Sequence, residues 1–278
     1  MRRKVLHSPL FVFGITLVVL LFSHFIVRGE RQSDRRVVPV EGYIGLAKGE
    51  TVTLAVPLLT RGSAYPAKVT VNGTGHPITK SFSVTPAQLS RDDLQYRTLT
   101  TDISMPSTGK HTLDSISIQW SDGITTKHPF GELVLDVRDT LWPGLLVDSY
   151  LAFWSEDLHQ MANDFRYQLE LLNNTDRKIV TIELAYEVKG FEVTRKSTHV
   201  SATPTAAQTT SVLFPNEKKD YRFSLKFLSG RYRPFFLFKP MIVLRLDNGG
   251  SVLRSGPLIS YLPTVAIEDL PTLWDMAR

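Results

Sequence analysis

Two short serine motifs have spacings that enzymes use for acyl transfer. Ser107-Thr-Gly-Lys110 has a Ser-x-x-Lys spacing, which works when the serine starts a helix and a Lys-Thr-Gly strand lies nearby. Here the motif falls in a turn before a predicted strand, and the chain contains no Lys-Thr-Gly. Gly249-Gly250-Ser251 lacks the glycine that a nucleophile elbow requires two residues after the serine. We therefore predict no catalytic serine.

The sequence also gives no support for a metal site or for a pair of acid–base carboxylates. No two histidines have the spacing of a helical metal pair, and the seven are His7, His24, His76, His111, His128, His159 and His199. The neighbouring carboxylates Asp92-Asp93 and Glu156-Asp157 would point to opposite faces of a strand or lie in solvated turns. The chain has no cysteine, which excludes disulfides, thiolate nucleophiles and cysteine zinc sites. We predict no catalytic residue, no metal and no cofactor.

One segment mixes aromatic and basic residues in a way that favours binding. Residues 230–240 read Gly-Arg-Tyr-Arg-Pro-Phe-Phe-Leu-Phe-Lys-Pro and lie between two predicted strands. On a loop, such residues can dock into a membrane interface, a polyanionic wall polymer or a protein. Alternatively, the phenylalanines fill the end of a sandwich and the basic residues face water. The candidate interaction residues are Arg231, Tyr232, Arg233, Phe235, Phe236, Phe238 and Lys239.

The elements that would position this segment are predicted to be strands. Apolar residues alternate with polar ones around Thr51–Val56, Ser115–Trp120 and Tyr221–Phe227, with turn residues between the runs. Asp122-Gly123 and Asp247-Asn-Gly-Gly250 are typical tight hairpin turns. This pattern indicates a mainly β fold of the sandwich or barrel kind.

Basic charge is concentrated at the start of the chain. Residues 1–36 hold seven basic and two acidic side chains, a net charge of +5, which equals that of the whole chain. Residues 37–278 therefore carry equal numbers of each sign. Charge that flanks an apolar segment suits lipid headgroups better than a nucleic-acid backbone, so we expect no nucleic-acid partner.

That apolar segment has the length of a membrane span. Residues 9–27 would form a helix of about 28 Å, close to the ~30 Å hydrocarbon core. A cleaved signal peptide is the alternative, but the segment is long for one and its best cleavage site contains Arg28. We predict an uncleaved single-pass anchor. Basic residues lie on both sides of the segment, so their distribution barely favours one orientation of the anchor over the other. The strand-rich, cysteine-free remainder of the chain favours an extracytoplasmic location for that remainder.

The remainder divides into two predicted immunoglobulin-like β-sandwich domains. Between them, Leu146, Tyr150, Phe153, Trp154, Leu158 and Met161 recur at helical spacing, which predicts a connecting helix. The C-terminal residues Ile267, Leu270, Leu273 and Trp274 give a shorter pattern of this kind. The predicted parts are a basic segment (1–8), the transmembrane helix (9–27), a juxtamembrane linker (28–36), a first sandwich (37–140), a linker or helix (141–163), a second sandwich (164–263) and a tail (264–278).

One sequence pattern resembles immunoglobulin-like domains, and two resemble modules of bacterial envelope proteins. Gly109-x-His111 before a strand is similar to the corner of immunoglobulin-like domains, with histidine in the usual tyrosine's place. Leu-Leu-Asn-Asn-Thr-x-x-x-Ile at 171–179 and Phe-Pro-x-x-x-x-x-Tyr-x-Phe-x-Leu at 214–225 resemble sandwich modules of membrane-anchored cell-envelope proteins. The resemblance implies the fold and carries no activity with it.

We therefore expect a non-enzymatic, membrane-tethered interaction or scaffold protein of a bacterial envelope, with a protein or a wall component as partner. One alternative is an envelope carbohydrate-binding module or hydrolase with a site built from loops. Another is a cytosol-facing protein, if the anchor inserts in the opposite direction.

Overall fold

The computed structural model of the protein describes residues 34–139, 145–148, 165–186, 191–195, 206–209, 212–227, 235–261 and 265–277. Their regular structure is almost entirely β-strand, with one short 3-10 helix, η1 (Ile267–Asp269), and one short α-helix, α2 (Leu270–Met276). The prediction of a mainly β fold is confirmed. Neither described helix has the length and apolarity to cross a bilayer, and the predicted span at 9–27 lies outside the described residues.

The first lobe contains two sheets that enclose one apolar core, as in a β-sandwich. Sheet A is antiparallel and is built from β1 (Arg35–Val37), β3 (Thr51–Arg61), β7 (Leu94–Ser104), β5 (Ile78–Val84) and, beside β7, β6 (Leu89–Arg91). Sheet B runs in the order β19 (Ile259–Tyr261), β16 (Phe236–Lys239), β2 (Glu41–Ala47), β9 (Thr125–Arg138), β8 (Gly109–Trp120) and β4 (Pro66–Gly73). In sheet B, β2 is parallel to both of its neighbours.

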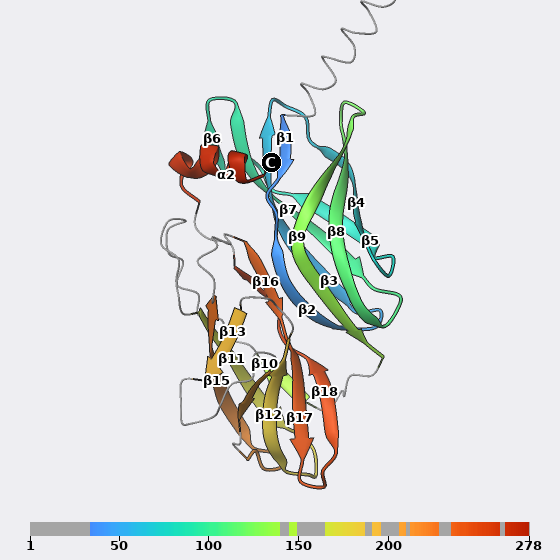
Figure 1. The fold of residues 1–278 in the computed structure, drawn as a ribbon, viewed down its shortest axis with the longest axis vertical. Helices are drawn as coiled ribbons and strands as arrows, with labels where there is room; N and C mark the ends of the chain where they lie inside the picture. Colours follow the sequence, from blue (N-terminus) through green and yellow to red (C-terminus); the bar gives the residue numbers. More distant parts are fainter. Residues whose placement is uncertain are drawn as a thin grey trace, which may run out of the picture.

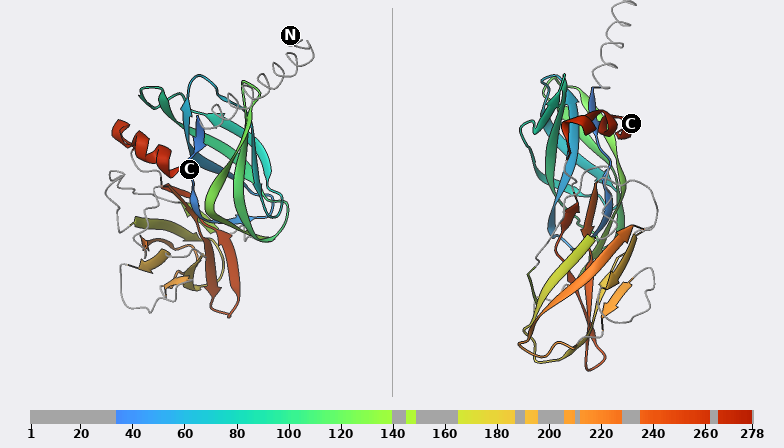
Figure 2. Two further views of the ribbon diagram at one scale, coloured as in Figure 1. Left: turned by 45° about the horizontal axis from the view of Figure 1, so that its top comes forward. Right: turned by 90° about the vertical axis from the view of Figure 1, so that its left-hand side faces the viewer.

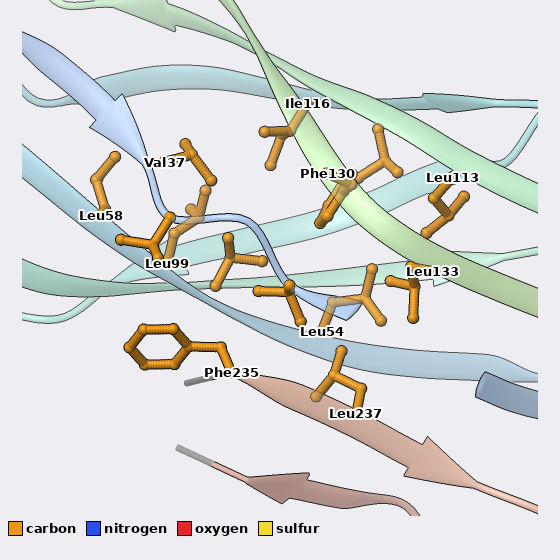
Figure 3. Packing of buried hydrophobic residues seen from close by; sticks show 14 of the residues in the cluster. Val37, Leu54, Leu58, Leu99, Leu113, Ile116, Phe130, Leu133, Phe235 and Leu237 are labelled. Atoms are coloured by element: carbon orange, nitrogen blue, oxygen red, sulfur yellow. The ribbon is translucent and has the colours of Figure 1, made fainter. Parts of the chain in front are cut away.

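Side chains at alternate strand positions fill the core of this lobe. Leu54 and Leu58 point inward from β3, and Leu113 and Leu133 meet them from β8 and β9 (Figure 3). These side chains are fully buried. Inward residues at every second position match the period of a strand, so the pattern read from the sequence corresponds to one covered face.

The second lobe contains two further sheets around a second core. Sheet C consists of β10 (Leu145–Asp148), β11 (Phe165–Asn173), β15 (Lys218–Phe227) and β13 (Phe191–Arg195), and sheet D of β14 (Ala206–Thr209), β12 (Ile179–Ala185), β17 (Met241–Leu246) and β18 (Ser251–Ser255). The two lobes lie end to end, with β16 between them (Figures 1 and 2).

Both predicted hairpin turns are present. Residues 121–124 join β8 to β9, and Gly123 has a φ of 82°. Residues 247–250 join β17 to β18, and Gly249 also has a φ of 82°. A positive φ is a conformation that glycine adopts without a steric penalty, which is why these turns were visible in the sequence.

Strand β1 differs from the predicted division of the chain. Arg35 and Arg36, expected in the juxtamembrane linker at 28–36, form part of β1 and pair with Thr60 and Leu59. Arg35 is buried because it reaches Asp122, which lies 87 positions away in the sequence. No local pattern in the sequence reports such a partner.

Strand β10 differs as well. Leu145–Asp148, within the predicted linker or helix at 141–163, is an edge strand that pairs with β11 from Leu145↔Asn173 to Asp148↔Glu170. Strand pairing therefore overrides the helical spacing of Leu146. The other residues of that predicted helix lie outside the described part of the chain.

The late part of the chain contributes to both lobes. Strands β16 and β19 come from the predicted second sandwich at 164–263, yet they complete sheet B of the first lobe. The predicted tail at 264–278 forms η1 and α2, whose Leu270 and Leu273 are buried in the first core. The chain thus enters the first lobe, builds the second, and returns to the first.

Candidate functional site

Four of the predicted interaction residues lie in the interior. Phe235, Phe236, Phe238 and Lys239 have exposed fractions of at most 6%, and three of them belong to β16. In this structure they offer no exposed loop surface. Residues Arg231, Tyr232 and Arg233 lie outside the described part of the chain.

Strand β16 divides its side chains between two cores. Phe235, just before the strand, and Leu237 point into the first core (Figure 3). Phe236 and Phe238 belong to the second core. A strand that is buried on both faces has a nearly continuous apolar sequence, which is the physical reason for this aromatic run.

Aromatic contacts hold β16 to the second lobe. The ring of Phe238 lies 5.6 Å from that of Tyr167 and 5.8 Å from that of Tyr186, both edge to face. The rings of Phe236 and Phe238 are stacked at 6.3 Å. Edge-to-face and offset arrangements of this kind add roughly 0.5–1.5 kcal/mol each beyond burial. The junction between the lobes is therefore packed like a core.

A partly buried ion pair closes the same junction. Lys239 Nζ donates to Glu50 Oε1, and Ser255 Oγ lies 3.4 Å from the same oxygen and donates to Gly45 O at 3.1 Å. Burial lowers the pKa of Lys239, and the hydrogen bond from its ammonium to Glu50 opposes that effect. The pair joins β16 to the turn between β2 and β3.

An open pocket of about 550 Å³ lies elsewhere, beside the point where the described chain begins. Such a volume falls within the ~300–1,000 Å³ of small-ligand pockets. Its lining combines β1, the start of β9 and the residue that follows α2, in the residues Arg35, Arg36, Thr125, Thr126, Lys127, His128, Pro129 and Ala277. The pocket is thus rich in basic side chains.

Arg35 is held in the wall of this pocket. Its Nη1 donates to Asp122 Oδ1 at 3.1 Å, and its guanidinium carbon lies 4.8 Å from the centre of the Trp120 ring. The hydrogen bond from Arg35 holds the pKa of Asp122 below its usual value. One buried donor, Arg35 Nε, has no hydrogen-bond partner among the described residues.

A short hydrogen-bond chain forms the next part of the wall. Trp120 Nε1 donates to Thr126 Oγ1 at 2.8 Å, and Thr126 Oγ1 lies 2.7 Å from His128 Nε2. Burial lowers the pKa of His128 to about 4. His128 is therefore neutral near pH 7, and its Nε2 shares a hydrogen bond with the Thr126 hydroxyl whose direction depends on the imidazole tautomer.

Two further cations complete the lining. Arg36 stacks on Trp274 of α2 at 4.1 Å and donates from Nη1 to the Trp274 carbonyl at 2.6 Å. Lys127 is exposed and forms no ion pair with any other described residue. Arg35 is paired with Asp122, and Arg36 and Lys127 add two further basic side chains to the lining.

The Ser107–Lys110 motif has a histidine neighbour but forms a bend before β8. Ser107 Oγ lies 3.4 Å from His111 Nε2, but the same nitrogen lies 3.1 Å from the Ser107 carbonyl oxygen. A carbonyl can only accept, so Nε2 carries a proton and cannot act as the base for the hydroxyl. No cluster of potential metal ligands occurs within the described residues.

Sequence reasoning did not find this pocket. Arg35 and Arg36 were assigned to a linker, and Lys127 and His128 received no role. One signal was present, because Thr126, His128 and Phe130 alternate with exposed residues along β9. Because side chains alternate along a strand, this pattern puts Thr126 and His128 on the buried face of β9. Only the fold brings β1 beside them.

No protein-family model matches the chain, and no curated protein matches it. Similar solved structures include the major pilin subunit of Bacillus cereus, with 10% identity, a TM-score of 0.28 and coverage of 84% of this chain and 70% of that one. An I-band fragment of titin has 12% identity, a TM-score of 0.22 and coverage of 79% and 62%. A Porphyromonas gingivalis protein of unknown function has 10% identity, a TM-score of 0.23 and coverage of 82% and 98%. Likenesses this low assign neither a family nor a function.

Proposed function

We propose that this chain is a membrane-tethered, extracytoplasmic interaction or scaffold protein of a bacterial envelope. In this proposal, residues 9–27 anchor it, its two lobes are immunoglobulin-like sandwiches, and the second lobe is presented to a protein or wall partner. The single observation that carries the proposal is strand β16, whose two faces belong to the two cores. A shared strand keeps the second lobe at a fixed position beyond the first.

The position of the chain termini in the molecule supports a second lobe that points away from the bilayer. Strand β1, where the described chain begins, and α2, near its end, lie at one end of the molecule (Figure 1). The β17–β18 hairpin lies at the opposite end (Figure 1). An anchor that precedes Asp34 would therefore leave the second lobe farthest from the bilayer.

Single-cysteine labelling in intact cells tests the proposal. The chain contains no cysteine, so one introduced thiol reports one position. Asn248→Cys, in the β17–β18 turn, should react with a membrane-impermeant maleimide in intact cells. Ser8→Cys, before the apolar segment, should react only after permeabilisation, and the protein should resist alkaline extraction from membranes.

Two outcomes would overturn the proposal. Labelling of Ser8→Cys in intact cells, with protection of Asn248→Cys, would place the lobes in the cytosol. Release of sugar or peptide fragments from cell-wall material by the purified full chain would make it an envelope hydrolase, which a scaffold is not.

A further inference from the structure

We propose that Asn248, at the tip of the β17–β18 hairpin, converts itself to aspartate and isoaspartate without an enzyme. The backbone nitrogen of Gly249 attacks the side-chain carbonyl carbon of Asn248. The side-chain amide takes up the proton that this nitrogen loses and leaves as ammonia. Water then opens the five-membered succinimide ring at either carbonyl, which gives aspartate or isoaspartate. This inference goes beyond the proposed function and is independent of the membrane anchor.

The attacking nitrogen lies in an open part of the turn. Asn248 and Gly249 are both exposed, and Gly249 has a φ of 82°. A Cβ at Gly249 would meet no other group within 4 Å, so no neighbour crowds this residue. Glycine has no side chain to shield its own nitrogen, and its backbone rotates more freely than that of any other residue. The reacting groups belong to adjacent residues, so ring closure is intramolecular and is favoured over attack by a separate molecule.

Two hydrogen bonds define the conformation of the turn. The Gly249 N–H donates to Leu246 O at 3.0 Å, and the Gly250 N–H donates to Asn248 Oδ1 at 3.0 Å. The first bond must open before the nitrogen can attack, and such opening costs little at the exposed tip of a hairpin. The second bond donates to the oxygen on which negative charge develops during the attack, so it polarises the carbonyl that is attacked.

The chain contains the same dipeptide once more, at Asn72-Gly73 in β4. There, Asn72 Nδ2 donates to Ser117 Oγ at 3.0 Å and to Ser115 Oγ at 3.3 Å, both on β8. A Cβ on Gly73 would lie 2.3 Å from the Thr112 carbonyl oxygen, so this backbone packs closely against β8. Rotation of the backbone toward the side-chain amide would break the pairing of β4 with β8. We therefore expect Asn72 to be protected from the reaction.

Two further turns each lack one requirement. Asn173 Oδ1 accepts a hydrogen bond from the backbone N–H two residues later, as in Asn248, but Asn173 is fully buried and Asn174 follows it. Asp122 also precedes a glycine, but its carboxylate pairs with Arg35. An ionised carboxylate is a much poorer target for a nitrogen nucleophile than an amide is. Within the described residues, exposure, a side-chain amide and a following glycine therefore coincide only at Asn248.

The reaction changes the tip of the second lobe in two ways. Either product adds a negative charge beside Asp247, which is also exposed. Isoaspartate additionally inserts a methylene group into the main chain of a tight turn. The hairpin lies at the end of the molecule opposite β1 (Figure 1), so the chemical change alters the surface that lies farthest from the start of the described chain.

The test follows both Asn-Gly sites in the purified full chain in detergent at mildly alkaline pH. Digestion and mass spectrometry report the exchange of the amide NH2 for OH at each site, and methylation by protein L-isoaspartate methyltransferase identifies isoaspartate. In the folded protein, Asn248 should react at least about tenfold faster than Asn72, because a paired strand opens far less often than a hairpin tip. In urea, where the fold is lost, the two sites should react at similar rates.

Two variants test the reacting pair. Gly249→Asp introduces a residue that tolerates a positive φ. It should slow the conversion of Asn248 about tenfold, because its Cβ shields the nitrogen and restricts the rotation that brings the two groups together. Asn248→Gln should remove the signal at this turn, since glutamine would have to close a six-membered ring.

Three outcomes would overturn the inference. The first is an equal rate at Asn248 and Asn72 in the folded protein. The second is an unchanged rate at Asn248 in Gly249→Asp. The third is a difference between the two sites that persists at the same size in urea, because it would assign the preference to neighbouring residues in the sequence instead of to the fold.

Discussion

The two lobes are filled in different ways. The first core is mainly aliphatic, with leucine, valine and isoleucine from long strands such as β3, β8 and β9. The second is richer in aromatic side chains, which make up seven of its sixteen buried residues. These rings come from both lobes, since Tyr43 of β2 belongs to this core together with Tyr167, Phe223 and Phe238. The first lobe thus covers one side of the second core.

This difference shows where the two lobes depend on each other. Phe235 and Leu237 enter the first core from a strand that is made late in the chain. Phe236 and Phe238 of the same strand enter the second. Damage at β16 should therefore affect both lobes, whereas damage elsewhere should remain within one, and the following changes test that contrast.

The largest effect is expected at Gly42, where β2 meets β16. A Cβ on this residue would lie 1.8 Å from the carbonyl oxygen of Leu237, and its φ is 147°. Gly42→Ala should cost roughly 5 kcal/mol or prevent folding, because backbone must move. Gly49→Ala, at a φ of 77° with open space around it, should cost about 1 kcal/mol. Thermal unfolding of the full chain in detergent would measure both, and equal effects would refute the close contact.

Phe238 is the next test of the shared junction. Phe238→Ala removes a ring that contacts Tyr167 and Tyr186, and should destabilise the protein by about 3–5 kcal/mol. Limited proteolysis should then cut both lobes more quickly. Phe214→Ala is the matched control, because Phe214 is 50% exposed, and we expect less than about 1 kcal/mol. Faster cleavage of the second lobe alone would show that the lobes are independent.

Removing the ion pair at the junction should cost more stability than removing an exposed ion pair within the second lobe. Lys239→Met removes the ammonium that pairs with Glu50 at the junction, and should cost about 2–3 kcal/mol. Adding Glu50→Gln should recover part of that loss. Lys218→Met breaks a pair with Glu170 in which the lysine is 62% exposed, so it should cost less than about 1 kcal/mol. A double-mutant cycle from chemical unfolding gives these values, and similar costs for both lysines would contradict the difference in burial.

Acid should loosen the first lobe before the second. The pKa of His128 is about 4 in the folded protein, below the ordinary 6.5, so the unfolded chain binds its proton more readily between these values. Stability is therefore present above pH 6.5 and is lost as the pH falls toward 4, by roughly 2 kcal/mol between pH 7 and pH 5. Amide hydrogen exchange in β9 should accelerate accordingly, relative to β12. His128→Gln should remove this pH dependence, and its persistence in that variant would assign the effect to another group.

Local features of the fold were predictable from the sequence. The turns at Asp122-Gly123 and Asp247–Gly250 depend on a few adjacent residues, so their composition was sufficient. Alternation over Thr51–Val56 and Ser115–Trp120 likewise marked strands β3 and β8. Such signals act over a few residues and do not depend on the strand's partner.

Long-range pairings were not predictable in this way. The continuous apolar sequence of β16 is compatible with any strand that is buried on both faces, and nothing near Leu237 indicates that it pairs with Gly42. The ion pair between Glu50 and Lys239 spans 189 positions. The pocket depends on β1 lying beside β9, so its four basic or titratable residues carried no shared signature in the sequence.

The contact between Arg36 and Trp274 has a practical consequence for engineered versions of this protein. It brings the two ends of the described chain to the same end of the molecule, where Arg36 and Ala277 line the same pocket. A fluorescent reporter fused after α2 would obstruct this pocket. An epitope inserted between Asn248 and Gly249 would be displayed at the opposite tip, on a turn whose residues are exposed.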